Sequence, residues 1–308
     1  MRNTNLERAS KVLGYLDFVG KMIERDKDYS EFYFRSQLLR YYNTLMIIEE
    51  NLKPGIALDI GSYPSHLHKM LLMMGYDAYG VDIDPDRIPL VLKDCRERTY
   101  AADIEAPGWN IGSRKYDMVF LLEVIEHLHV NPFIIFLEMN NLLKKGGYLF
   151  LSTPNLFSLR NRINYVRGRY VYEHPLSVYE KLERHGSRGH QRIYSIEELE
   201  DILDVYGFDV INKWCRNDSS PALHIEGIKK FLNDDFSFDR FARFWGQSVS
   251  WKGKIKLKIE EKLNRRFSGY YNSIYLIARK NRAYDRSKVV EKIRKADRWA
   301  SCEKFQLK

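Results

Sequence analysis

The chain has 308 residues, of which 44 % are hydrophobic and 30 % are charged, a balance typical of a folded protein rather than a disordered one. No apolar run approaches the roughly 18 residues of a membrane-spanning helix, and the first residues lack the apolar core of a secretory signal. The three cysteines, Cys95, Cys215 and Cys302, lack metal-finger spacing, so the composition favours a reducing cytoplasm.

The net charge of +9 is concentrated near the end of the sequence. Residues 252–308 contain 18 Lys and Arg against 6 Asp and Glu, a net charge of +12, which leaves −3 for residues 1–251. Such a basic segment binds nucleic acid, anionic lipid or an acidic glycan, or it is a solvated helix surface without a partner. The charge pattern alone leaves these alternatives open.

Two amphipathic helices are predicted first, over residues 6–24 and 31–52, because apolar side chains recur there at helical spacing. After Pro54 and Gly55 the pattern changes to short apolar runs that predict strands at residues 56–60, 78–81, 99–102, 118–122 and 148–152. Helices are predicted between these strands, at residues 64–74, 85–93 and 131–143. This alternation indicates parallel βαβ units, an α/β fold and a doubly wound sheet.

Beyond residue 154 the alternation stops, and residues 156–194 form an irregular or helical cap. Ser195 and Glu198 form a capping-box pattern that predicts a helix over 195–206. The later predicted elements are a strand at 208–213, an insertion at 216–269, a strand at 273–278 and a basic helix at 284–299. In that last helix, we expect Val289, Val290 and Ile293 to pack on the body and Lys288, Lys292, Lys295 and Arg298 to face outward.

The chain therefore divides into five parts, each with its own pattern. They are an N-terminal helical segment (1–53), a core (54–215 and 270–281), a cap within that core (156–194), an insertion (216–269) and a basic C-terminal helix (282–308).

The first strand-turn-helix of the core has the features of a cofactor loop. Gly61 permits a tight turn, and we expect the following helix to begin at Pro64. About twenty residues later, Asp82 ends the second strand, where an acidic side chain can bind ribose hydroxyls. Tyr63 and His66 stand where a dinucleotide-binding loop has its later glycines. The loop therefore favours a cofactor with a ribose and no pyrophosphate, S-adenosylmethionine over NAD.

Six segments resemble the class I S-adenosylmethionine-dependent methyltransferases, over roughly residues 50–215 and the strand at 273–278. In order, they are LDIGSYPSHL, GVDIDP, AADIEAP, YDMVFLLEVIEHL, LLKKGGYLFLSTPN and IYSIEELEDILDVYGF. The resemblance implies a Rossmann-like sheet of seven strands whose last strand is antiparallel. It also implies that the methionine part of the cofactor lies near the first turn, the ribose on the acidic residue of the second strand and the adenine after the third. The implied cofactor-binding residues are Asp59, Gly61, Ser62, Tyr63, Asp82, Ile83, Asp103, Ile104, Leu122 and Glu123.

Glu123, Glu126 and His127 stand at i, i+3 and i+4, so they would share one face if the chain becomes helical after the strand. Methyl transfer to a hydroxyl group requires removal of its proton, by a base or with the help of a metal ion. His127 is the first candidate for the base, with Glu126 beside it, because the pKa of histidine lies near neutrality. The alternative is a histidine that only packs at the strand-to-helix turn.

Together with His190, this triplet resembles the metal-binding set of two methyltransferase branches. These are the ubiquinone-biosynthesis O-methyltransferases and the small-RNA 3′-terminal 2′-O-methyltransferases. The resemblance implies that Glu123, Glu126, His127 and His190 hold a divalent metal ion. Mixed carboxylate and imidazole ligands suit Mg²⁺, Mn²⁺ or Zn²⁺.

The cap is rich in Arg, His and Tyr, which favours an acidic or hydroxyl-rich acceptor. Its G-H-x-R-x-Y-S-x-x-E-L layout is similar to methyltransferases of surface-polysaccharide assembly. The main interpretation is O-methylation of a glycan or another small acceptor, with sugar-phosphate and lipid-linked acceptors included. The alternatives are an RNA 2′-O-methyltransferase with a divalent metal and a non-catalytic binding protein of the same fold. The expected location is the cytoplasm, with peripheral contact at the inner membrane face as a further expectation.

Overall fold

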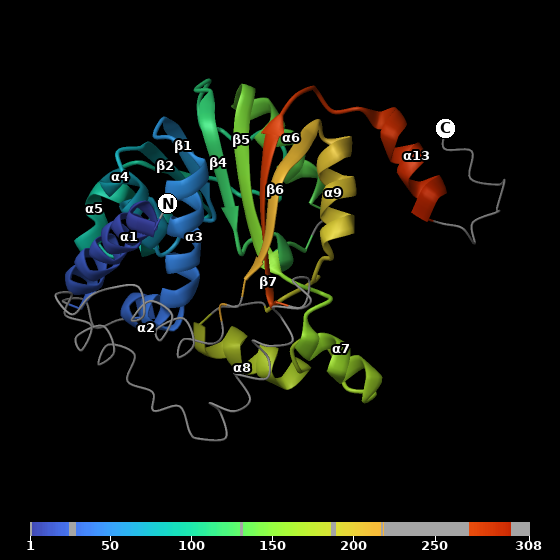
Figure 1. Ribbon diagram of the computed structural model, residues 1–308, viewed down its shortest axis with the longest axis horizontal. Coiled ribbons are helices and arrows are strands. Elements are labelled where there is room, and N and C mark those ends of the chain that lie inside the picture. The colour runs from blue at the N-terminus through green and yellow to red at the C-terminus, as the bar shows by residue number, and fades with distance from the viewer. Residues whose placement is uncertain are drawn as a thin grey trace.

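A computed structural model describes residues 2–24, 29–129, 132–185, 189–216, 218 and 271–296 of the chain. Within this part, a seven-stranded sheet lies between two layers of helices (Figure 1). The strands are β1 (Ile56–Ile60), β2 (Asp77–Asp82), β3 (Thr99–Ala101), β4 (Tyr116–Leu122), β5 (Leu143–Pro154), β6 (Phe208–Arg216) and β7 (Ser273–Lys280).

The sheet has the strand order β3-β2-β1-β4-β5-β7-β6. Strands β1 to β5 are parallel to one another, whereas β7 lies antiparallel between β5 and β6. The predicted α/β class, the doubly wound order, the seven strands and the reversed last strand are confirmed.

Helices cover both faces of this sheet. On one face lie α1 (Arg2–Ile23), α2 (Tyr29–Ser36), α3 (Leu38–Asn51), α4 (His66–Met73) and α5 (Lys93–Arg96), and on the other lie α6 (Phe133–Leu142) and α9 (Ile196–Val205). Neighbouring strand residues alternate between the two cores: Phe120 and Phe150 pack with the N-terminal helices, and Val119 and Leu149 with α6 and α9. Because parallel strands covered on both faces need apolar side chains on both faces, the central predicted strands are mainly apolar and do not alternate with polar residues.

The predicted helix over 31–52 is wrong as a single element, because the chain breaks at Gln37 into α2 and α3. Phe32 is 69 % exposed, although it follows the apolar pattern, whereas Phe34 is fully buried. The helix expected to begin at Pro64 begins at His66, since Ser65 before it has a left-handed backbone with φ of 68°.

The predicted helix over 85–93 is also wrong. It consists of two 3-10 turns, Pro85–Arg87 and Leu90–Leu92, followed by the short helix α5. The cap contains two helices, α7 (Leu159–Val166) and α8 (Pro175–His185), at the lower edge of the sheet in Figure 1. The Ser195 capping box is confirmed at the start of α9, with both reciprocal hydrogen bonds present.

The basic C-terminal helix α13 (Arg286–Ala296) packs beside α9 (Figure 1). Lys288 Nζ lies 2.6 Å from Asp204 Oδ1 and Lys292 Nζ 2.6 Å from Asp201 Oδ1, so the expectation that these two lysines face outward is wrong. The acidic residues of α9 attract them, and the helix turns part of its basic face toward the body. The side chains of Lys295 and Arg298 and nearly all of the predicted insertion lie outside the described residues.

No helix among the described residues combines the length and the apolar character needed to cross a lipid bilayer.

Candidate functional site

The carboxyl ends of β1, β2, β4 and β5 meet at one edge of the sheet, because these strands are parallel. The strand order reverses between β1 and β4, and open α/β sheets bind ligands outside the carboxyl ends at such a reversal. The cap helices α7 and α8 lie at this same edge (Figure 1). The geometry therefore puts the predicted site residues at the ligand-binding edge of the fold.

Asp59 is a buried carboxyl group near the end of β1, with only 4 % of its surface exposed. No hydrogen-bond donor among the described residues reaches it, and burial together with the nearby Asp82 raises its pKa to about 8. A buried carboxyl group without a partner favours a positively charged ligand group, which restores the compensation that water would give.

Asp82 ends β2 and organises the loop opposite Asp59. Its Oδ2 accepts a hydrogen bond from the Tyr63 backbone N–H at 3.0 Å, and its Oδ1 accepts from Asp84 N–H and the Arg87 guanidinium. The Arg87 guanidinium also lies over the Tyr63 ring, 4.6 Å from its centre. Arg87 is about half exposed, so a ligand hydroxyl can replace it at Oδ1 without breaking the two backbone bonds.

The other predicted cofactor residues lie on neighbouring loops. Gly61 has φ of +70°, and a Cβ at that position would lie 2.7 Å from a Val124 methyl group, so the turns after β1 and β4 touch only because residue 61 is glycine. Ser62 is buried and Ile83 is 66 % exposed beyond Asp82. Asp103 and Ile104 follow β3, and Leu122 ends β4.

The turn after β4 departs from the predicted helix. Glu123 has a left-handed backbone with φ of 58°, and Ile125–His127 forms a 3-10 turn. The shared helix face expected for the two glutamates and His127 is therefore wrong. Glu123 Oε2 accepts a hydrogen bond from Arg40 of α3 at 3.1 Å, and its Oε1 accepts from the Ser152 hydroxyl at 2.9 Å.

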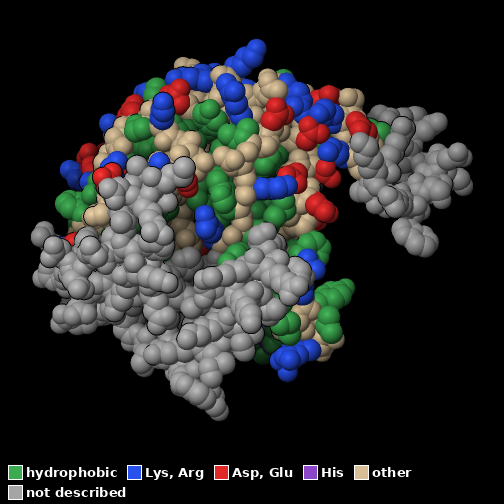
Figure 2. Space-filling model, in the orientation of Figure 1, with side chains coloured by type: hydrophobic (Ala, Val, Ile, Leu, Met, Phe, Trp, Pro, Cys, Tyr) green, Lys and Arg blue, Asp and Glu red, His purple; other side chains and the backbone are tan. Residues whose placement is uncertain are grey.

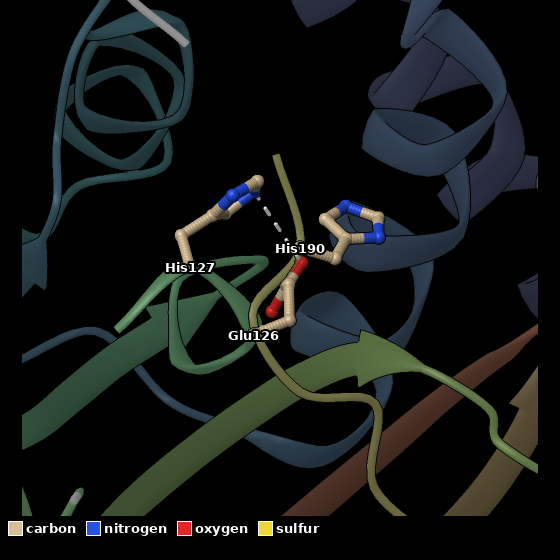
Figure 3. Close-up of side chains that lie close together, drawn as sticks. All are labelled: Glu126, His127 and His190. Atoms are coloured by element: carbon tan, nitrogen blue, oxygen red, sulfur yellow. Dashed lines mark ion pairs between the residues drawn. The ribbon is translucent and has the colours of Figure 1, made fainter. Parts of the chain in front are cut away.

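Glu126, His127 and His190, three of the four residues that the resemblance implies as metal ligands, lie close together (Figure 3). Each offers a ligand atom within 4.8 Å of the others, and His127 Nε2 lies 3.9 Å from Glu126 Oε1. Glu126 Oε2 accepts from the Thr153 hydroxyl, but in the described part of the chain nothing donates to its buried Oε1. Glu123 lies outside this group of three.

Backbone contacts hold His190 beside the turn. The Glu126 carbonyl accepts from Gln191 N–H at 2.6 Å, and the Gly189 carbonyl accepts from His127 Nδ1 at 2.7 Å. Gly189 has φ of +67°, and a Cβ there would lie 2.9 Å from both Glu173 Oε2 and a Val178 methyl group. Only glycine therefore allows the cap and the His190 loop to pack this closely.

The surroundings shift the pKa values of all three groups. Burial, reinforced by the Glu123 charge, raises the pKa of Glu126 well above its usual range. Burial lowers the pKa of His127, although the hydrogen bond to the Gly189 carbonyl acts in the opposite direction. Burial, together with the nearby charge of His127, lowers the pKa of His190 to about 4. Near neutral pH both imidazoles therefore offer a lone pair.

A cavity of about 590 Å³, here called the edge cavity, opens beside this cluster. Side chains from α3, the β4 and β5 ends, the cap and the His190 loop line it, among them Gln37, Arg40, Glu123, Asn155, Arg160, Asn161, Asn164, Tyr170, Tyr172, Glu173, His174, His190 and Asp218. Its wall is polar and aromatic, and it offers both hydrogen-bond donors and acceptors.

Arg40 is the residue of this site that sequence reasoning missed. Its guanidinium also donates to the Tyr33 hydroxyl at 2.7 Å, so two N-terminal helices reach the end of β4. Leu38, Leu39 and Tyr41 around it are buried, and a charge inside such an apolar stretch is the one signal in the sequence.

The three clustered side chains fit a divalent metal ion. One unpaired buried carboxylate oxygen faces two imidazoles, and His127 binds a backbone carbonyl through its other ring nitrogen, as metal-bound histidines do. One carboxylate and two imidazoles suit Mn²⁺ or Zn²⁺ better than an all-oxygen site would.

A family model described as a methyltransferase domain matches residues 30–213. Two curated proteins, both ubiquinone biosynthesis O-methyltransferases, are similar to this chain. The one from Pelagibacter ubique is 27 % identical over 109 residues, 35 % of this chain and 45 % of its own. The one from Glaesserella parasuis is 27 % identical over 123 residues, which are 37 % of this chain and 52 % of its own. The match thus spans about half the length of these relatives.

Among solved structures, a SAM-dependent methyltransferase from Archaeoglobus fulgidus aligns with a TM-score of 0.47 at 20 % identity. The alignment covers 82 % of this chain and all of the other.

Proposed function

Because the chain belongs to the class I S-adenosylmethionine-dependent methyltransferases, we propose that it transfers a methyl group to a hydroxyl group of an acceptor in the edge cavity. The observation that carries this proposal is the oriented His127 imidazole, held by the Gly189 carbonyl beside the cavity-lining His190. Methyl transfer to a hydroxyl requires a group that accepts its proton, and His127 has the geometry for that task.

The β1 and β2 ends bind the cofactor. Asp59 receives the ammonium group of its methionine part, since this carboxyl group is buried and has no donor among the described residues. Asp82 accepts a ribose hydroxyl at Oδ1 while its Oδ2 keeps the Tyr63 loop in position, and the exposed Ile83 packs on the adenine. When bound there, S-adenosylmethionine supplies an electrophilic methyl group on a sulfonium.

His127 takes the acceptor proton. Its Nδ1–H donates to the Gly189 carbonyl, which leaves the Nε2 lone pair as the acceptor. Glu126 Oε1 lies 3.9 Å from this nitrogen, and its carboxyl group, once ionised, stabilises the imidazolium that forms. His190, with its ring centre 4.8 Å from that of His127, forms the wall of the edge cavity and orients the hydroxyl group.

The lining of the edge cavity supports a sugar-like acceptor. Tyr170 and Tyr172 offer aromatic faces on which a sugar ring stacks, and Asn161 and Asn164 offer amides for its hydroxyls. Arg160 at the same wall suits a phosphate or carboxylate of the acceptor. A glycan or a sugar phosphate, free or lipid-linked, is therefore the acceptor class.

A second candidate is a metal-assisted reaction, as in an RNA 2′-O-methyltransferase. The unpaired Oε1 of Glu126 beside two imidazoles favours it. A site with Glu123 as a fourth ligand fits less well, because both carboxylate oxygens of Glu123 already accept hydrogen bonds, from Arg40 and Ser152. Glu126, His127 and His190 would hold the ion, which would lower the pKa of the acceptor hydroxyl.

The test is a methyl-transfer assay with labelled S-adenosylmethionine and a panel of acceptors: sugar phosphates, lipid-linked sugars, phenols and short RNA. We expect O-methylation of a sugar compound, identified by mass spectrometry. His127→Ala should lower turnover by about 10²–10⁴-fold with cofactor affinity retained, whereas His129→Ala, a neighbouring exposed histidine, should not. Methylation at nitrogen, or normal turnover of His127→Ala, would refute the proposal.

A further inference from the structure

The first cap helix carries large hydrophobic side chains that are exposed to solvent. Val166 is 88 % exposed, Tyr165 77 %, Tyr170 65 % and Phe157 48 %. We call residues 157–170 the α7 patch. In Figure 2, hydrophobic and Lys or Arg side chains occupy the lower right of the surface, where α7 projects from the body in Figure 1. Exposure of this degree on neighbouring residues is typical of an interaction surface.

The α7 patch is also strongly cationic. It contains Arg160, Arg162, Arg167 and Arg169 and no acidic residue. Arg167 and Arg169 are exposed, and neither forms an ion pair within the described ranges. Arg162 lies over the Phe157 ring at 5.2 Å, so this cation and this aromatic ring occupy one place on the surface. Cations next to exposed aromatic and aliphatic groups suit an anionic surface with an apolar interior.

Helix α7 connects the α7 patch to the edge cavity. Asn161 and Asn164 line the edge cavity and are partly buried, whereas Arg162, Tyr165 and Val166 of the same helix are exposed. A surface that receives the exposed side of α7 therefore lies at the mouth of the edge cavity.

We propose that the α7 patch binds the surface of an anionic lipid membrane. Tyr165 and Val166 enter the headgroup region, and Arg162, Arg167 and Arg169 pair with lipid phosphates and anionic headgroups. A nucleic acid would account for the arginines, but it offers no apolar interior for a valine that is 88 % exposed.

The basic helix α13 is the other candidate for membrane contact, and it fits less well. Its Lys288 and Lys292 are bound to Asp204 and Asp201 of α9, so these charges are already neutralised within the protein.

Membrane contact at α7 would bring a lipid-carried acceptor to the edge cavity. This consequence rests on the proposed function, whereas the membrane contact itself does not. A vesicle-binding experiment without cofactor or acceptor therefore tests the contact independently of methyl transfer.

The experiment is sedimentation of the full chain with vesicles of pure phosphatidylcholine or of phosphatidylcholine containing one third phosphatidylglycerol, at low and moderate salt. The wild type should partition onto the anionic vesicles. Arg167→Gln with Arg169→Gln should lower the partition coefficient about tenfold or more, given roughly fivefold per cation at such a surface. Tyr165→Ser with Val166→Ser should lower it severalfold at unchanged charge. Both pairs are exposed, so thermal unfolding should stay near wild type.

The matched control is Lys288→Gln with Lys292→Gln, which also removes two positive charges but on helix α13. This variant should partition as the wild type does. Equal partitioning of wild type and both α7 variants would overturn the proposal. So would a loss seen only for the arginine variant and abolished by competing RNA, because that result would identify a polyanion site.

Discussion

The Arg40 guanidinium binds the Glu123 carboxylate across 3.1 Å and thereby joins helix α3 to the turn after β4. Both side chains are largely buried, at 16 % and 11 % exposed. Burial raises the pKa of Glu123, and the charge of Arg40 opposes that rise. The N-terminal helices are thus part of the site and not an appendage to the core.

Arg40→Leu should destabilise the protein by about 3–5 kcal/mol, because it leaves Glu123 buried without its cation. Urea unfolding measures the loss. Adding Glu123→Gln should recover part of it, since the amide carries no charge. Arg35→Leu, at a 41 % exposed position on α2, is the control and should cost less than about 1 kcal/mol. A small loss for Arg40→Leu would mean that Glu123 finds another partner.

The buried Asp59 should make stability depend on pH. Its pKa in the fold, about 8, lies above the unfolded value near 3.8, so the folded state holds a proton that the unfolded state releases. Its contribution is fully present below pH 4 and is lost as the pH rises toward 8. Without cofactor, Asp59→Asn should therefore be more stable than wild type at pH 8 by a few kcal/mol in order of magnitude, and nearly equal at pH 4.

The same variant should bind S-adenosylmethionine at least tenfold more weakly in calorimetry, because its amide cannot pair with an ammonium group. A parallel rise of cofactor affinity and stability would contradict the assignment of Asp59.

If the cluster of Glu126, His127 and His190 binds a divalent metal ion, each of the three side chains should be a ligand. Titration of the protein with Mn²⁺, followed by electron paramagnetic resonance, should show one site. Glu126→Gln, His127→Ala and His190→Ala should each weaken it about tenfold or more, since each removes a ligand atom. Glu123→Gln should leave it nearly unchanged, because Glu123 binds Arg40 and Ser152 instead. Loss of Mn²⁺ in Glu123→Gln would instead support the four-ligand set.

Lys288→Gln with Lys292→Gln should lower the free energy of unfolding by about 1 kcal/mol or less. The two ion pairs with α9 are partly exposed, at 29 % and 27 % for the lysines, and exposed pairs contribute little. Exchange of the α13 amides with solvent should accelerate, because the pairs hold this helix to the body. Unchanged exchange would mean that the apolar side of α13, with Val289, holds the helix alone.

The central strands of the fold are predictable from the sequence because they are short and mainly apolar. The run at 56–60 coincides with β1, and that at 118–122 lies within β4. Helix boundaries are less predictable where backbone geometry overrides the pattern. Ser65 and Glu123 both have left-handed backbones, a conformation that neither residue type predicts from the sequence.

The sequence predicts which residues form the cluster of Glu126, His127 and His190, but not how they are arranged. Its geometry depends on backbone bonds from the His190 loop to the Glu126 carbonyl, which no side-chain pattern encodes. Arg40 lies 83 residues before Glu123, so their pairing follows from the packing of α3 and not from any local motif.

The position of β7 also sets the order in which the sheet can be completed during synthesis. Strand β7 lies between β5 and β6, yet it is the last of the seven described strands to be translated, after the residues from 217 to 272 that follow β6. At a translation rate of about 5–20 residues per second, several seconds pass between the synthesis of β6 and that of β7, the strand with which both β5 and β6 pair. During that interval the edge of β5 that later pairs with β7 lacks this partner strand, and an unpaired strand edge is prone to aggregation. A chaperone that shields this edge should therefore act before residue 273 leaves the ribosome.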